Sequence, residues 1–254
     1  MTKIFNKNRV PHIILLYWII KIASTTLGET GADMFSMTYN FGYENTILLF
    51  MGLFALFLAI KLSIKRYEPL TYWLTFTATA IAGTAISDYI DRTLGLGYAL
   101  GSGLLMVLLI LILFAWYLHD KSINVERITN STSEIFYWGA FLVANTLGTA
   151  AGDFLADELK FGFAQSAMII TMVLVIIALF HFYTKVSSVL LFWLAFVLTR
   201  PFGATFGDLL TKTDEKGGLD LGTVGSSLFF AVILLLALMR EVHVEKKKKI
   251  NEFD

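Results

Sequence analysis

Four tryptophans mark the start of a pattern that the chain repeats four times. They are spaced 55, 65 and 55 residues apart, and each is followed by a glycine ten residues later and an aspartate fifteen residues later. The tryptophans are Trp18, Trp73, Trp138 and Trp193; the glycines are Gly28, Gly83, Gly148 and Gly203; the aspartates are Asp33, Asp88, Asp153 and Asp208. These columns align without gaps, which indicates a unit that was duplicated and then duplicated again.

The composition predicts a polytopic membrane protein. Of the 254 residues, 56% are hydrophobic and only 16% are charged, and the mean hydropathy is +0.69. A soluble domain carries about 25% charged residues, and several apolar runs here approach the roughly 20 residues that span a bilayer. The net charge of zero argues against a nucleic-acid partner. The absence of cysteine excludes disulfides, thiolate metal sites and a cysteine nucleophile.

Each unit contains two apolar spans, so we expect an all-α fold with eight transmembrane helices in a single membrane domain over 1–254. The expected helices are 11–36, 43–62, 70–92, 97–118, 134–156, 162–184, 188–210 and 221–240. The repeats are then 11–62, 70–118, 134–184 and 188–240, with a basic cytoplasmic tail over 241–254. Because each unit crosses the membrane twice, the four copies are parallel. Their pseudo-symmetry axis should therefore lie along the membrane normal.

The basic residues orient this arrangement. Fourteen lysines and arginines lie on the side of the termini and four on the other side. The positive-inside rule then places both termini in the cytoplasm. The first apolar run carries Lys21 and has no small-residue cleavage site, so we interpret it as a retained helix rather than a signal peptide. Lys21 itself is expected to snorkel toward the cytoplasmic side and to have no further role.

The repeated aspartates should lie at one depth and face one space. Fifteen helical residues put each aspartate roughly 22 Å from its tryptophan, near the outer face. Positions 7, 8, 11 and 15 after each tryptophan share one helical stripe, and most of them are polar. A polar stripe on a membrane helix avoids lipid. The odd-numbered helices should therefore form an inner ring around a common space, with the even-numbered helices outside.

The acids of this stripe are the candidate functional residues. Carboxylates with nearby hydroxyls are hard oxygen ligands, suited to Mn²⁺, Mg²⁺ or Ca²⁺. The expected metal site comprises Asp33, Asp88, Asp153, Asp208 and Glu29. The alternative is that each aspartate only marks the exit of its helix into solvent. Glu29 lies one turn deeper than Asp33, and we expect it to form an ion pair with Arg200, or else Arg200 to contact one of the aspartates within the bundle. Such a pair either acts as a gate or only fixes the packing.

The repeated glycines admit two interpretations. They either let neighbouring helices approach closely or mark local unwinding beside a binding site, which Pro201 would assist in the fourth copy. The four histidines occupy no common position in the repeat, and the chain has no GxxxxGK[ST] phosphate loop. No catalytic residue is assigned.

The four units resemble an uncharacterised bacterial integral-membrane family that is defined by a fourfold repeat of unknown function. The resemblance rests on the segments "YWIIKIASTTLGETGAD", "YWLTFTATAIAGTAISD", "YWGAFLVANTLGTAAGD" and "FWLAFVLTRPFGATFGD". It implies a location in the bacterial inner membrane and brings no settled activity. The fourth copy departs from the others by an insertion within "TKTDEKGGLD" and by "RP" before its glycine.

Three functions remain open at this point. The first is a small secondary transporter or channel for a cation, foremost a divalent metal and secondly in proton-coupled exchange. The second is an intramembrane lipid hydrolase that uses a carboxylate-bound metal. The third is a non-transporting assembly or sensor protein. The expected partners are the lipid bilayer and the cation, and the only expected cofactor is a divalent cation.

Overall fold

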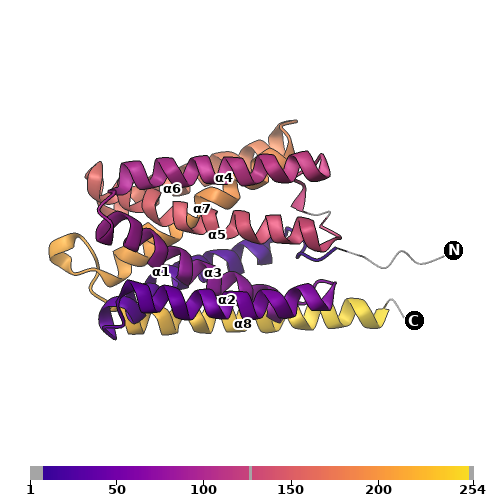
Figure 1. Cartoon of the computed structure of the whole chain (residues 1–254), viewed down its shortest axis with the longest axis horizontal. Helices are drawn as coiled ribbons and strands as arrows, with labels where there is room; N and C mark the ends of the chain where they lie inside the picture. Colours follow the sequence, from indigo (N-terminus) through magenta and orange to yellow (C-terminus); the bar gives the residue numbers. More distant parts are fainter. Residues whose placement is uncertain (1–7, 126–127, 252–254) are drawn as a thin grey trace.

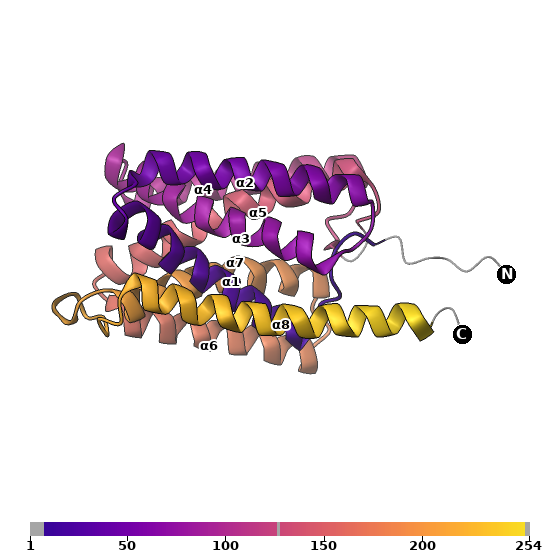
Figure 2. The same ribbon diagram turned by 90° about the horizontal axis from the view of Figure 1, so that it is seen from below.

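The described part of the chain contains helices and the loops that join them, and no strands. A computed structural model describes residues 8–125 and 128–251, in which eight long helices run side by side (Figures 1 and 2). They are α1 (Leu15–Asp33), α2 (Gly42–Ile64), α3 (Pro69–Asp88), α4 (Tyr98–Asp120), α5 (Ser131–Asp153), α6 (Gly162–Tyr183), α7 (Ser188–Thr211) and α8 (Thr223–Asn251). The first described residues and the end of α8 lie at one end of the bundle, here called the terminal end.

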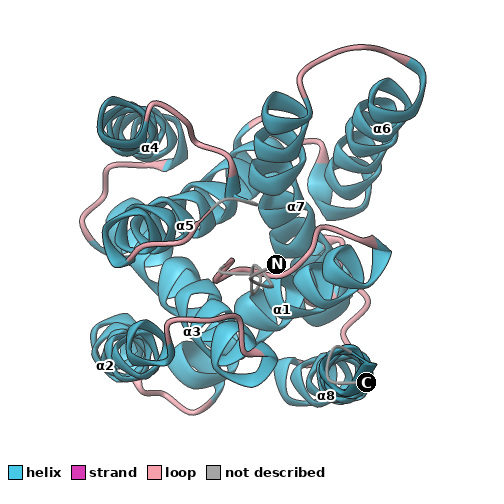
Figure 3. Cartoon of the chain, turned by 90° about the vertical axis from the view of Figure 1, so that its right-hand side faces the viewer, coloured by secondary structure: helices cyan, strands magenta, loops and turns pink. Residues whose placement is uncertain are grey.

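The odd-numbered helices form a closed inner ring. In order around the ring, α1 packs on α3, α3 on α5, α5 on α7, and α7 on α1 again. Each even-numbered helix packs outside against the inner helix of the following repeat: α2 on α3, α4 on α5, α6 on α7, and α8 back on α1 (Figure 3). The inner and outer rings expected from the sequence are thus present, and the last helix closes the circle onto the first repeat.

The four aspartates lie together near the opposite end of the inner ring, here called the carboxylate end. Asp33, Asp88 and Asp153 each end an α-helix and are followed at once by one turn of π-helix: η1 (Met34–Thr38), η2 (Tyr89–Thr93) and η4 (Phe154–Glu158). In the fourth repeat, α7 instead continues past Asp208 to Thr211, and the insertion forms the short 3₁₀-helix η5 (Asp214–Lys216). Single π turns within helices are frequent at functional sites.

Local signals set the starts of several inner helices. The side chain of Glu68 accepts a hydrogen bond from the Thr71 backbone N–H, and Pro69 occupies the first turn of α3. Asn130 caps α5 in the same way through the Ser133 N–H. These side chains satisfy amide groups that a helix start leaves unpaired, and proline costs nothing there.

Several helix bounds differ from the sequence-based expectation, including the first bound of α1 and the last bound of α8. Residues 8–14 are not helical, so α1 begins at Leu15 rather than at 11. Helix α8 runs on through the basic segment to Asn251 instead of ending at 240. Lysine is a good helix former, so the start of the expected tail continues the last helix (Figures 1 and 2).

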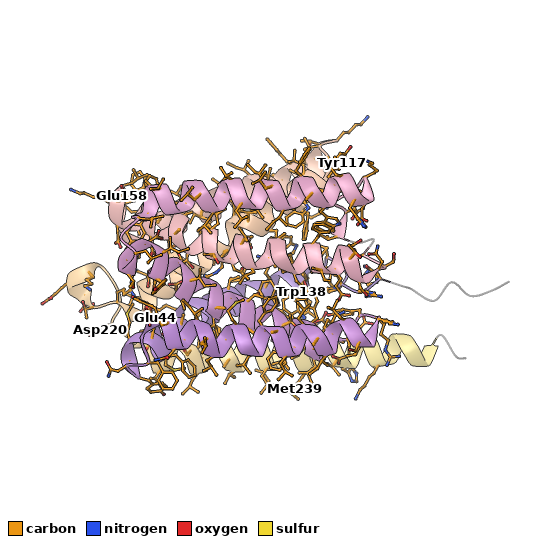
Figure 4. All side chains as sticks on the ribbon, viewed as in Figure 1. Glu44, Tyr117, Trp138, Glu158, Asp220 and Met239 are labelled. Carbon is orange, nitrogen blue, oxygen red and sulfur yellow. The ribbon has the colours of Figure 1, made fainter. Side chains whose placement is uncertain are left out.

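The outside of the bundle is apolar. Among the described residues, five helices are long and apolar enough to cross a membrane: α2, α4, α6, α7 and α8 over Thr223–Lys247. Large hydrophobic side chains along their outer faces are exposed, among them Leu104 and Phe182. Met239 of α8 is another (Figure 4). Within the described residues, this surface and the repeat confirm a membrane-type protein with internal duplication.

Candidate functional site

The inner ring is filled by layers that take one residue from each repeat. Five such positions recur every four residues along the inner helices, a spacing that keeps them on one helical face. From the carboxylate end, the layers are the carboxylate layer (Asp33, Asp88, Asp153, Asp208), the Glu29 layer (Glu29, Thr84, Thr149, Ala204), the Arg200 layer (Thr25, Ala80, Asn145, Arg200), the phenylalanine layer (Lys21, Phe76, Phe141, Phe196) and the tyrosine layer (Tyr17, Tyr72, Tyr137, Phe192). All but Phe192 are buried.

Glu29 and Arg200 meet at the centre of the ring. The Arg200 Nη1 atom lies 3.3 Å from Glu29 Oε2, so the ion pair expected from the sequence is present. Arg200 Nη2 donates to Thr149 Oγ1 at 2.8 Å and to the Thr84 hydroxyl, while both threonine hydroxyls also lie 3.3 Å from Glu29 Oε2. Residues from all four inner helices thus converge on this one group of contacts.

Two cations bridge the four aspartates in pairs. Lys212 Nζ lies 2.6 Å from Asp33 Oδ2 and 3.0 Å from Asp208 Oδ1. Arg92 Nη2 lies 3.1 Å from Asp153 Oδ2 and 3.5 Å from Asp88 Oδ1. All four carboxylates are only 2% exposed. The aspartates are therefore not scattered over a solvated rim.

Sequence reasoning counted Arg92 and Lys212 only as basic residues of the outer side. Both follow the aspartate of their own repeat by four residues, a spacing that places two side chains next to each other on a helix. The corresponding positions in the first and third repeats are Met37 and Asp157. The i, i+4 spacing was the signal that could have identified these cations, and it recurs in alternate repeats only.

The charges at the carboxylate end do not balance. Four carboxylates face two bridging cations, so two negative charges remain when all the groups are ionised. Asp33 Oδ1 is buried without a hydrogen-bond partner. Burial lowers the pKa of Lys212, but Asp208 and Asp33 outweigh burial and hold that pKa well above its ordinary value. Lys212 is therefore a permanent cation in this layer.

The predicted metal ligands are brought together only in part. Within residues 8–125 and 128–251, no group of three or more His, Asp or Glu side chains is already arranged to hold a metal ion. Glu29 is occupied by Arg200, one layer below the aspartates. The oxygen atoms are of the hard type that Mg²⁺, Ca²⁺ and Mn²⁺ prefer. Binding of a metal by these five acids stays a prediction.

The repeated glycines are points of close helix packing. A methyl group on any of them would overlap the residue seven positions after the tryptophan of the next repeat. The contacts run around the whole ring: Gly28 on Ala80, Gly83 on Asn145, Gly148 on Arg200, and Gly203 on Thr25. All four glycines lie inside regular helix. The close-packing interpretation is thus confirmed, and the unwinding interpretation is wrong.

The phenylalanine and tyrosine layers were not foreseen. Phe141 stacks on Phe196 with ring centroids 4.0 Å apart, and Phe76 contacts Phe141 edge-on at 5.5 Å. The Tyr72 and Tyr137 hydroxyls are 2.5 Å apart. Lys21 does not snorkel, because its side chain is fully buried among these rings. The signal was present in the repeat alignment, as positions one before and three after each tryptophan.

Most of the tryptophans lie inside the bundle rather than at a lipid interface. Trp73 and Trp138 are 1% exposed and Trp193 is 6% exposed, while Trp18 is partly exposed. Figure 4 shows Trp138 within the bundle, with Glu158 and Asp220 at the carboxylate end. These three tryptophans are therefore part of the hydrophobic core of the bundle.

An acid at the terminal end holds the start of the chain. Glu134 accepts from Arg9 Nη1 at 2.8 Å and from Lys61 Nζ at 2.9 Å. The Arg9 backbone N–H donates to Ile128 O, and the Tyr67 N–H donates to Asn8 O. Since α5 lies across the ring from α1, residues 8–10 run over the terminal end of the ring.

A cavity of about 610 Å³ opens between α1, α6 and α7. Its walls are mostly apolar, with Trp18, Ile22 and Phe192 among them, and Thr199 also lines it. None of the four aspartates lines this cavity. A lipid entering here would not meet the carboxylate layer, so the lipid-hydrolase alternative gains no support.

The fold and the layers inside the ring define the class of the protein. Over the described residues it is an all-helical repeat protein with five helices able to cross a membrane and a buried polar core. The family model of the Repeat of Unknown Function (DUF347) matches residues 16–67, 71–122, 136–187 and 191–247, and the chain belongs to this family. Comparison with curated proteins and with solved structures gave no match.

Proposed function

We propose that this chain is a small secondary transporter that exchanges a divalent cation for protons through the ring of α1, α3, α5 and α7. One observation carries the proposal: four buried aspartates share only two cationic side chains. The cation candidates are Mn²⁺, Mg²⁺ and Ca²⁺, because carboxylate and hydroxyl oxygens suit hard cations.

The exchange follows from the charge that the carboxylate layer leaves uncompensated. A buried charge without a counter-ion costs several kcal/mol. One divalent cation, or two protons on the carboxylates, would neutralise the layer. Both would use the same oxygen atoms, so binding of one expels the other. This competition is the elementary requirement for an exchanger.

The two bridging cations are placed to control entry. The side chains of Arg92 and Lys212 are 31% and 18% exposed, in contrast to the buried aspartates. Arg92 also donates to the hydroxyls of Tyr43 and Tyr98 at the surface of the bundle. Movement of either cation toward solvent would open the layer to an incoming ion.

Next to this layer, on its terminal-end side, the Glu29–Arg200 pair blocks the centre of the ring. The arginine fills the centre of the ring and binds side chains from α1, α3 and α5. Passage of an ion requires this pair to separate, and we assign it the role of an inner gate. It is asymmetric, since only the first repeat supplies an acid and only the fourth an arginine at these positions.

The proposal includes eight membrane-spanning helices related by a fourfold pseudo-symmetry axis along the membrane normal. Helices α1, α3 and α5 have 19, 20 and 23 residues, close to the roughly 20 that a bilayer needs. Their polar stripes point into the ring and are shielded from lipid. The excess of basic residues on the terminal end supports the further part of the proposal, that both termini lie in the cytoplasm and that the membrane is a bacterial inner membrane.

Transport in proteoliposomes tests the function. The probe is Mn²⁺ uptake, with Ca²⁺ and Mg²⁺ as competitors and a trapped dye that reports internal pH. We expect uptake to be accompanied by proton release from the vesicle, and the double variant Asp33→Asn, Asp208→Asn to lose both signals. The matched control is Asp157→Asn, an exposed acid at the same end. If the wild-type protein moves none of these cations under either pH gradient, the transporter is excluded and an assembly or sensor role is favoured.

A further inference from the structure

Lys21 is placed where the other three repeats have phenylalanine. Its side chain is fully buried, and its ammonium nitrogen donates to Phe196 O at 2.9 Å and to the Thr199 hydroxyl. The same nitrogen lies 4.0 Å from the centre of the Phe196 ring and 5.7 Å from that of Phe76. All of these partners are neutral.

No carboxylate in the described part of the chain forms an ion pair with Lys21. The charged residue that acts on it is Arg200, which repels a second positive charge. An ammonium removed from water is costly without a counter-ion, and neutral oxygens and aromatic rings offset only part of that cost. Ionisable side chains inside membrane bundles often mark proton or ion pathways. This environment favours a side chain that can give up its proton.

Helix α1 carries polar groups on both sides of Lys21. Residues Tyr17, Lys21, Thr25, Glu29 and Asp33 follow one another every four residues, which is about 6 Å along a helix. All five are buried. The other three members of the phenylalanine layer are apolar rings in mutual contact, and such a constriction excludes water. Within this layer, Lys21 supplies the one group able to bind a proton.

We propose that Lys21 is a proton-binding site at the narrow level of the ring and is the group that carries protons past the phenylalanine layer. The neutral amine takes up a proton on its nitrogen lone pair, and the resulting ammonium donates to Phe196 O and the Thr199 hydroxyl. Release returns the proton toward the carboxylate end or toward the terminal end. The coupling of this site to cation movement rests on the proposed function, whereas proton binding by Lys21 does not.

In the described part of the chain, titratable groups from all four inner helices and from α8 surround this half of the ring. Tyr17 lies one turn away on α1, Tyr72 belongs to α3, Tyr137 to α5, Arg200 to α7 and Glu241 to α8. Tyr17 interacts with Tyr72 of the same layer and with Glu241 of the outer helix α8. The Glu241 carboxylate accepts a hydrogen bond from the Tyr67 hydroxyl at 2.5 Å. Lys21 thus lies between the tyrosine layer and Arg200.

The direct test observes the proton on Lys21 itself. Protein labelled with ¹⁵N-lysine is reconstituted in lipid, and its side-chain nitrogen resonances are followed from about pH 5 to about pH 10. The Lys21 signal is identified by its loss in Lys21→Arg, a variant that keeps a positive charge, or in Lys21→Met. We expect this signal to change between ammonium and amine within the range. A Lys21 that stays in one protonation state throughout overturns the proposal, whether or not the protein transports a cation.

The second test measures coupling in the proteoliposomes described above. We expect Lys21→Met and Lys21→Arg to lose proton counterflow while Lys65→Met, at an exposed position near the terminal end, behaves as wild type. A Lys21→Met variant that moves as many protons per cation as wild type also overturns the proposal and leaves the exchanger intact. If the wild type moves no cation, the proposed function fails, and the nitrogen resonance alone decides the role of Lys21.

Discussion

Gly28 of α1 lies against Ala80 of α3 so closely that a methyl group on Gly28 would stand 2.7 Å from the Ala80 Cβ atom. The same relationship recurs between each inner helix and the next around the ring. The repeated glycine therefore sets the distance between the inner helices, and through it the width of the polar axis.

Gly28→Ala and Gly83→Ala should each destabilise the protein by about 1–3 kcal/mol, the usual cost of overpacking. The measurement is thermal or denaturant unfolding in detergent micelles. Gly139→Ala on α5 is the matched control, because nothing lies within 4 Å of a methyl group there. This control should gain as much as about 1 kcal/mol from helix propensity. Equal effects at all three positions would contradict the packing role.

Arg200→Met should lower the free energy of unfolding by about 3–5 kcal/mol, because it leaves Glu29 buried without its counter-ion. Glu29→Gln should also destabilise the protein, because it leaves Arg200 buried without its counter-ion. The double variant should recover a large part of the loss, since no unpaired charge remains. Unfolding of the two single variants and the double variant measures the coupling. Strictly additive losses would show that the pair does not interact in the folded protein.

Glu134→Gln should loosen the start of the chain at the terminal end. The change leaves Arg9 and Lys61 buried without the acid that joins them. Hydrogen exchange should then accelerate at the Arg9 and Tyr67 amides, which bond to Ile128 O and Asn8 O. Glu158→Gln, at an exposed site of the other end, serves as the control. Unchanged protection of both amides would mean that residues 8–10 are held by other contacts.

Asp91, just beyond the end of α3, should make stability depend on pH. Burial raises the pKa of Asp91 to about 6, against lowering by Ser87 and Arg92. In the unfolded chain the pKa is about 3.9. The folded state therefore binds the proton more tightly, and its stability falls as the pH rises from about 4 to about 6.

The variant Asp91→Asn removes this dependence. Above about pH 6, its free energy of unfolding should exceed that of the wild type by up to about 2 kcal/mol, and this difference should vanish below about pH 4. Unfolding midpoints measured across this range test the sign. A loss of stability in Asp91→Asn at neutral pH would indicate that the ionised carboxylate has a stabilising partner.

The repeat, the all-helical fold, the membrane-type composition and the inward stripe of each odd-numbered helix could all be predicted from the amino-acid sequence. These properties depend on residue type and on spacing along one helix, which fix the face that a side chain occupies. Even the Glu29–Arg200 pair followed from this information, because an acid and a base on inward stripes at similar depth have few other partners.

Which helices are neighbours and which long side chains contact each other could be seen only in the three-dimensional structure. Each outer helix packs on the inner helix of the next repeat, a choice that the spacing of apolar residues does not encode. Arg92 and Lys212 reach across to an aspartate of another repeat, and Lys21 turns inward among phenylalanine rings instead of toward water. Contacts of this kind depend on the order and rotation of four helices around one axis, because a flexible side chain can reach several partners until packing removes all but one.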